Sequence, residues 1–339
     1  MLITIGLVAL AVLLFLLLWQ GLIVLLVAFA AVLLAVFLNG IARVLERYTP
    51  LSYGWALGLV VLIIPVLLAG FIWLAGSNID KQFSNLVKEL PKSVEKLQEQ
   101  IEKTTLGQTL LDNAPDPEEM VQAQSGGVGR IAGFFSTTLG ALGNLVVIVI
   151  VGIYLAINPS IYIQGFAQLI PQKKRDRAVE VLHAMGHALR RWLVGRVVSM
   201  AIVGVLTTVG LLLLGVPLAL SLGLLAALLS FIPNLGPILA VVPAMLIAWM
   251  DSAQLALFVA ILYIAIQVVE SYLITPMIEK KAVSIPPALL LMGQILFGVL
   301  FGIMGLVLAT PLLVVVIVLV QMVYVEDTLG EPVEVLGEG

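Results

Sequence analysis

The stretch Ser230-Phe231-Ile232-Pro233-Asn234-Leu235-Gly236-Pro237 interrupts a long apolar run, and Pro243 follows six residues later. Proline lacks the backbone donor that a helix needs and glycine is a poor helix former, so this stretch predicts a helix break. Inside a bilayer, a broken helix is tolerated only where the freed backbone groups are buried in protein or face water. The break therefore calls for a structural or functional purpose.

Composition sets the class of protein. Of the 339 residues, 61% are hydrophobic and 11% are charged, with a mean hydropathy of +1.17. These values predict an all-α, polytopic integral membrane protein. The net charge of −3 excludes a generic nucleic-acid binder, and the absence of cysteine excludes disulfides, thiol catalysis and thiolate metal sites. No basic region precedes the first apolar run, which is longer than that of a signal peptide, so we expect a retained first span.

Residues 1–76 are predicted to hold three transmembrane helices. Residues 1–38 carry no charge and are long enough for two spans, with a turn at Trp19-Gln20-Gly21, and the third follows before residue 76. Residues 77–130 are expected to form an extracytoplasmic helical segment, because apolar residues recur there at heptad spacing. That stripe either packs on the protein's own surface or mediates self-association. Residues 131–157 form a further predicted span.

Charge predicts the topology. Residues 158–196 hold seven basic and two acidic residues, a net charge of +5, whereas residues 77–130 hold six basic and nine acidic, a net charge of −3. The positive-inside rule therefore places 158–196 in the cytoplasm, as basic amphipathic helices, and 77–130 outside. Within the former, residues 161–169 are weakly amphipathic, as a helix along the membrane interface is. Counting spans back predicts a cytoplasmic N-terminus.

Residues 197–250 are predicted to form a transmembrane helix followed by a re-entrant hairpin around the break. Each apolar arm beside the break is shorter than the ~30 Å hydrocarbon core requires. The alternative is one long crossing, but that would place Lys280 and Lys281 outside, so the charges favour the hairpin. Residues 251–324 are predicted to repeat the pattern of a span and a hairpin, and an acidic C-terminal tail covers 325–339.

The two hairpins share a spacing of glycine and proline. The first reads Pro217-x5-Gly223-x12-Gly236-x3-Ala240-x2-Pro243, and the second reads Pro287-x5-Gly293-x11-Gly305-x3-Ala309-x-Pro311. We interpret the two units as an inverted repeat, an arrangement in which broken helices build the substrate site of many secondary transporters. The predicted structural hinges are Pro233, Pro237, Pro243, Gly305 and Pro311.

Glu270 is the only ionisable residue well inside an apolar run after residue 197. An acidic residue within a span costs roughly 2.5–3.5 kcal/mol on insertion scales, so it is a functional candidate, and Tyr263 and Gln267 share its helix face. The alternative is that Glu270 lies at the inner interface and pairs with Arg196, Lys280 or Lys281. The full set of predicted substrate- or ion-binding residues is Glu270, Gln267, Asn234, Ser230, Gly236, Thr275, Gln294 and Thr310. No metal site is expected, because the His183 and His187 pair is typical of a solvated helix face.

Several motifs occur in a fixed order and spacing along the chain: Asn158-Pro159, Gly195-Arg196, Ile232-Pro233-Asn234-Leu235-Gly236-Pro237 with Pro243, Gln267-x-x-Glu270 with Pro276, and Phe301-Gly302-x-x-Gly305-x3-Ala309-x-Pro311. Together they resemble the autoinducer-2 exporter (AI-2E) family of bacterial permeases. The resemblance extends over almost the whole chain. It implies a transporter of the cytoplasmic (inner) membrane that works without ATP, and a homo-oligomer. Family members are linked to export of a small signalling molecule or to sodium/proton antiport, so the resemblance does not specify the substrate.

The sequence thus favours a secondary transporter that moves a small solute or ion, driven by a proton or sodium gradient through Glu270. No cofactor is expected beyond a coupling H⁺ or Na⁺, and no partners beyond the lipid bilayer, the substrate and further copies of the chain. The alternative is a non-transporting membrane scaffold, in which the prolines are packing kinks. An intramembrane enzyme is disfavoured, because the apolar segments hold no cysteine, metal-binding pair or Asp pair.

Overall fold

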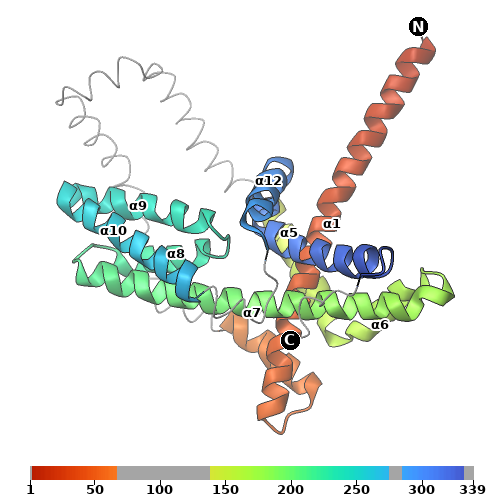
Figure 1. The fold of residues 1–339 in the computed structure, drawn as a ribbon, viewed down its shortest axis with the longest axis horizontal. Helices are drawn as coiled ribbons and strands as arrows, with labels where there is room; N and C mark the ends of the chain where they lie inside the picture. The colour runs from red at the N-terminus through yellow and green to blue at the C-terminus, as the bar shows by residue number, and fades with distance from the viewer. Residues whose placement is uncertain (1, 67–137, 275–284, 332–339) are drawn as a thin grey trace. The chain divides into compact units, whose positions relative to one another are not determined.

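A computed structural model describes residues 2–66, 138–274 and 285–331 (Figure 1). Every regular element in those residues is a helix. The main helices are α1 (Leu2–Tyr48), an unlabelled helix over Tyr53–Val66, α5 (Thr138–Ile157), α6 (Pro159–Gln168), α7 (Arg175–Leu213), α8 (Ala219–Leu229), α9 (Leu235–Asp251), α10 (Ala253–Val269) and α12 (Pro287–Leu319). Short 3-10 or π turns cover Gln172–Lys174, Glu270–Ile274 and Val320–Glu326.

The all-α, polytopic fold class is confirmed. Among the described residues, four helices are long and apolar enough to cross a membrane, or five if the bent pair formed by α5 and α6 is counted as one span. Helices are the expected solution, because a helix satisfies its own backbone hydrogen bonds where no water is present.

The N-terminal helix differs from the prediction. α1 runs without interruption for 47 residues, so the turn predicted at Trp19-Gln20-Gly21 is wrong. A single glycine costs a helix only about 1 kcal/mol, whereas a turn in apolar surroundings would leave several backbone groups unpaired. A single unbroken helix reduces the number of spans predicted for residues 1–38 from two to one. The cytoplasmic N-terminus stays a prediction.

Further along the chain, α5 ends at Ile157, where Asn158-Pro159 predicts an end, and α6 is bent away from it by 89°. α7 then runs for 39 residues from the basic segment into the following apolar run, as one helix. The heptad segment at 77–130, Thr275, both lysines at 280 and 281 and the tail from 332 onward lie outside the described residues.

The chain divides into two compact units. The first comprises residues 1–65, 144–195 and 278–339. Small side chains allow its helices to approach closely, since Ala42, Ala56 and Ala156 are almost completely buried in one cluster. Tyr53 supports the same junction, because its hydroxyl donates to the Ala156 carbonyl and accepts from the Asn39 amide at 3.0 Å.

The second unit comprises residues 66–143 and 196–277. In it, α8, α9 and α10 pack with the C-terminal part of α7 around a core that includes Leu211, Leu222 and Val259. Glycines make the contacts with α7 close. A Cβ atom at Gly223 would collide with Thr208, and one at Gly210 would collide with Leu262. This packing holds α8 and α9 as a hairpin, which we call the first hairpin.

The first hairpin turns through residues 230–234, between the end of α8 and the start of α9. Pro233 lies in this turn, and Pro237 lies in the first turn of α9, where a missing backbone donor is harmless. Pro243, in contrast, lies inside α9. The chain therefore reverses next to the first two prolines, whereas Pro243 lies within a helix, and the hinge roles of all three stay predictions.

The second hairpin is formed by α12, whose two arms, 287–301 and 303–319, meet at Gly302. The backbone of Gly302 has φ +64° and ψ −146°, a conformation essentially restricted to glycine. Pro311 lies inside the second arm, and Gly305 follows the break by three residues. The chain reverses at a single permissive residue that precedes both Gly305 and Pro311, and the hinge roles of these two residues stay predictions.

The same kind of close contact occurs within each of the two hairpins. A Cβ atom at Gly236 would collide with the Leu229 carbonyl oxygen, and one at Gly305 would collide with the Phe297 carbonyl oxygen. In each hairpin, the glycine soon after the break thus lets the returning arm touch the backbone of the first arm. This agrees with the repeat in the glycine spacing. The opposite orientation of the two span-and-hairpin repeats stays a prediction.

Candidate functional site

Glu270 lies at the junction between α10 and a π-helical turn over Glu270–Ile274, and it is only 4% exposed. A π turn widens the helix and is frequent at functional sites. A carboxylate this buried in an apolar unit requires compensating partners.

Two α7 residues supply those partners. The Ser199 hydroxyl donates to Glu270 Oε1 at 2.7 Å, and Arg196 Nη1 lies 3.4 Å from the same oxygen. The side chains of Arg196 and Glu270 are 11% and 6% exposed, so the ion pair is largely removed from solvent. Breaking such a pair by removing one partner leaves an uncompensated buried charge, at a cost of about 3–5 kcal/mol.

Arg196 also contacts the first hairpin. Its Nε donates to the Phe231 carbonyl at 3.2 Å, and that carbonyl belongs to the turn between α8 and α9. One guanidinium therefore joins the buried carboxylate to the helix break. The helix break thus has a structural role, because the reversal of the chain presents the Phe231 carbonyl oxygen to the Arg196 guanidinium.

A small cavity of about 10 Å³ adjoins this ion pair. Its volume is close to that needed for a single water molecule. The walls come from α7, α8, the first-hairpin turn, the start of α9 and α10, and they consist of Val203, Thr207, Ala226, Ser230, Pro237, Tyr263, Ile266, Gln267 and Glu270.

Four oxygen atoms of this lining are buried and have no hydrogen-bond partner among the described residues. They are Thr207 Oγ1, Ser230 Oγ, Tyr263 OH and Gln267 Oε1. The Gln267 amide nitrogen is engaged, because Nε2 donates to Ser271 Oγ at 3.2 Å. Each unsatisfied buried polar group costs about 1–3 kcal/mol, so four around one cavity require an explanation. A water molecule or a small cation at their centre would satisfy them.

Comparison with known proteins identifies the family. The family model for "AI-2E family transporter" matches residues 4–324, which include the whole cavity. The chain belongs to the AI-2E transporter family. It is therefore a membrane transporter that acts on a small solute.

Individual relatives of this family support the same assignment. The chain is 25% identical to "Putative transport protein YueF" of Bacillus subtilis over 293 residues, or 82% of this chain and 78% of the relative. It is 30% identical to "Putative transport protein YrrI" of the same organism over 143 residues, or 42% and 40% of the two chains. Identity to "Putative transport protein YhhT" of Escherichia coli is 23% over 279 residues, or 76% and 73%.

The structure brings three of the predicted site residues of this AI-2E family chain together, namely Glu270, Gln267 and Ser230. Asn234 and Gly236 instead shape the hairpin turn. Asn234 is exposed and has φ +64°, and the lack of a side chain at Gly236 permits the contact with the Leu229 carbonyl. The alternative pairing of Glu270 with Arg196 is present, with side chains that are 6% and 11% exposed.

The remaining predicted residues lie elsewhere. Gln294 and Thr310 are buried in the second hairpin, which belongs to the other compact unit, and Thr275 lies outside the described residues. Gly293 lies next to Leu313, and Gly305 lies next to Phe297, on opposite arms of the hairpin. This register puts Gln294 and Thr310 at the same height along the two arms.

Sequence reasoning missed Ser199 and Thr207, and it named Arg196 only as an alternative partner. A signal was available, because Arg196, Ser199 and Thr207 follow one another at intervals of three and eight residues and so share a face of α7. A polar stripe on an otherwise apolar span indicates a surface that faces protein or water.

Proposed function

We propose that the chain is a secondary transporter of the cytoplasmic (inner) membrane, which moves a small solute or ion and is driven by a proton or sodium gradient through Glu270. The observation that supports this most directly is the cavity, where a buried carboxylate and four partnerless oxygens surround space for one water-sized occupant. Oxygen ligands suit both a proton carrier and a hard cation.

The ion pair suggests how occupancy of Glu270 is linked to conformation. A proton or cation that binds Glu270 neutralises the carboxylate that pairs with Arg196, while the same guanidinium keeps its contact with the Phe231 carbonyl. Breaking a buried ion pair costs about 3–5 kcal/mol. Moving a two-state equilibrium from 1:99 to 99:1 takes about 5.5 kcal/mol, so this change supplies most of what a conformational switch at the first hairpin requires.

The test is gradient-driven flux in proteoliposomes, measured across a panel of cations and small polar metabolites. Glu270→Gln keeps the size of the side chain and removes the charge, so its flux is expected to lose dependence on the pH and sodium gradients. Glu180→Gln is a matched control, because it removes an exposed carboxylate from α7 outside the cavity. Full gradient dependence in Glu270→Gln would show that the coupling role is wrong.

The non-transporting scaffold is distinguished by water access. The chain contains no cysteine, so single-cysteine variants such as Ser230→Cys report on one position only. Labelling of the introduced thiol by aqueous maleimide from either side of the membrane supports a transport pathway. Absence of labelling together with absence of flux would favour the scaffold. The inner-membrane location and the homo-oligomer rest on the family resemblance, and membrane fractionation and light scattering of the solubilised protein test them.

A further inference from the structure

α6, which connects α5 to the turn before α7, does not continue in the direction of α5. We call this region, residues 158–177, the corner. α5 has 20 residues, about 30 Å, which is enough to cross the hydrocarbon core alone. α6 then turns by 89°, with Pro159 at its first position and the Ser160 hydroxyl donating to the Asn158 side chain at 2.6 Å. If α5 crosses the bilayer, α6 therefore runs along its surface.

One face of α6 exposes large apolar side chains. At 100° per residue, Tyr162, Phe166 and Leu169 fall within about 60° of one another. Phe166 is 55% exposed and Leu169 is 81% exposed, whereas Ala167 on the other side is 4% exposed. Three large apolar groups on one exposed face outside the span mark an interaction surface.

Two lysines come soon after α6 in the sequence. Lys173 and Lys174, in the 3-10 turn before α7, are exposed and have no ion-pair partner among the described residues. Arg175 is engaged, because it donates to the carbonyls of Ile170 and Gln168 at 3.2 Å each. These bonds satisfy carbonyls at the C-terminal end of α6 and fix the turn.

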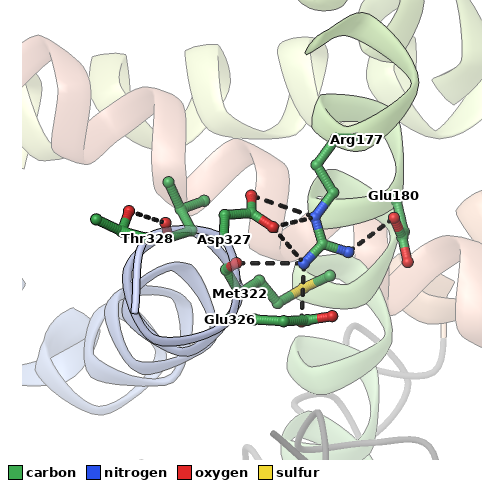
Figure 2. Close-up of polar contacts among 7 residues, drawn as sticks. Arg177, Glu180, Met322, Glu326, Asp327 and Thr328 are labelled. Carbon is green, nitrogen blue, oxygen red and sulfur yellow. Dashed lines mark hydrogen bonds and ion pairs between the residues drawn. The ribbon is translucent and has the colours of Figure 1, made fainter. Parts of the chain in front are cut away.

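Arg177 is also engaged, as Figure 2 shows. Its guanidinium lies 2.8 Å from Glu180, 2.7 Å from Glu326 and 3.0 Å from Asp327, and it donates to the Met322 carbonyl at 3.2 Å. The arginines thus hold the corner together, and the lysines are left for an anion outside the protein.

We propose that α6 and the two lysines form a docking surface for the anionic leaflet of the membrane. Tyr162, Phe166 and Leu169 enter the boundary between headgroups and acyl chains, and Lys173 and Lys174 contact lipid phosphates. Amphipathic helices with flanking basic residues bind anionic bilayers in this way, and each lysine near such a surface strengthens binding roughly fivefold. The occupant is a lipid surface, because the face continues directly from a membrane-spanning helix.

The depth of α6 is measured in the full-length protein with single-cysteine variants bearing bimane. Phe166→Cys probes the apolar face, and Gln164→Cys probes the opposite side of the same helix as a matched control. In proteoliposomes containing lipids with brominated acyl chains, we expect several-fold stronger quenching at position 166 than at 164. Equal strong quenching at both positions would mean that α6 lies within the hydrocarbon. Iodide quenching at both would mean that it is solvated, and protection of 166 from both quenchers would mean that protein covers it. Each of these three results overturns the proposal.

The charge contribution is measured separately. Bimane emission at position 166 is expected to shift to the blue when phosphatidylglycerol replaces phosphatidylcholine. Lys173→Gln/Lys174→Gln should lose most of this shift, and Lys173→Arg/Lys174→Arg should keep it. An unchanged shift in the Gln double variant would overturn the role of the lysines. Leu169→Cys provides a second probe of the apolar face if Phe166→Cys does not fold.

Discussion

The first and second hairpins reverse the chain in different ways. The first uses a five-residue turn that contains Pro233 and exposes the Phe231 carbonyl to Arg196, whereas the second uses the single residue Gly302. The first lines a polar cavity beside a buried ion pair, and no ionisable residue occurs anywhere in α12. The comparison indicates that both hairpins share a packing rule, while the longer turn adds the polar groups that a transport site needs.

The largest effect is expected where the hairpins are alike. Gly236→Val and Gly305→Val each force a side chain against a backbone carbonyl that cannot rotate away. Overpacking typically costs 1–3 kcal/mol, and we expect about 3 kcal/mol or more here because backbone must move. Thermal unfolding of the solubilised protein measures this loss. Gly186→Ala, where nothing lies within 4 Å, should be neutral or slightly stabilising. Wild-type stability in one Val variant alone would break the common packing rule.

The next effect is expected only at the first hairpin. Glu270→Gln removes the carboxylate of the buried ion pair with Arg196 and should destabilise the protein by about 3 kcal/mol. Arg196→Gln in the same chain removes the second member of the pair, so the double variant should be more stable than the sum of the single variants predicts. A double-mutant cycle from chemical or thermal unfolding measures the coupling. Additive effects would mean that the pair contributes no interaction energy.

The two turns can be compared through their backbone conformations. Gly302→Ala places a Cβ atom in a conformation reserved for glycine and should cost about 1–3 kcal/mol. Asn234 already has a positive φ, so Asn234→Gly should relieve strain and leave stability unchanged or raised by up to ~1 kcal/mol. The unfolding temperature should therefore fall for Gly302→Ala and stay unchanged or rise for Asn234→Gly. A stable Gly302→Ala variant would contradict the single-residue reversal.

The smallest effect on stability is expected for two threonine variants, which should differ from each other in transport. Thr207 and Thr310 are both buried, and their hydroxyls have no partner within the part of the chain that the structure describes. Valine nearly matches the shape of threonine. Thr207→Val and Thr310→Val should each change stability by no more than ~1 kcal/mol. Flux in proteoliposomes is expected to fall for Thr207→Val, which loses a cavity oxygen, and to stay near wild type for Thr310→Val. Equal loss in both variants would extend the site to the second hairpin.

The sequence predicted the fold class and the break at Ser230–Pro237 because proline and glycine act locally, through missing donors and permissive backbone angles. It failed at Trp19-Gln20-Gly21 for a related reason. Glycine without proline permits a turn but does not require one, and the apolar surroundings favour an unbroken helix. The same ambiguity put the second hinge at Gly305, whereas the chain reverses at Gly302.

The candidate site was predictable only in part. Glu270 is conspicuous because a carboxylate in an apolar run has few structural uses. Ser199 and Thr207 are not conspicuous, because single hydroxyls are common in membrane helices and can bond to their own backbone. Their importance depends on which face of α7 meets α10, and that is set by long-range packing at Gly210 and Leu262. A single sequence gives no direct account of such contacts.

The distance along the chain between Arg196 and Glu270 also affects how the protein is made. The two residues are 74 positions apart, so Arg196 leaves the ribosome well before its partner exists. At synthesis rates of 5–20 residues per second, the delay is roughly 4–15 s. During that interval the ion pair between Arg196 and Glu270 cannot form, although α7 and the first hairpin have already been synthesised. This ion pair is therefore a late contact in the order in which the second unit can be assembled.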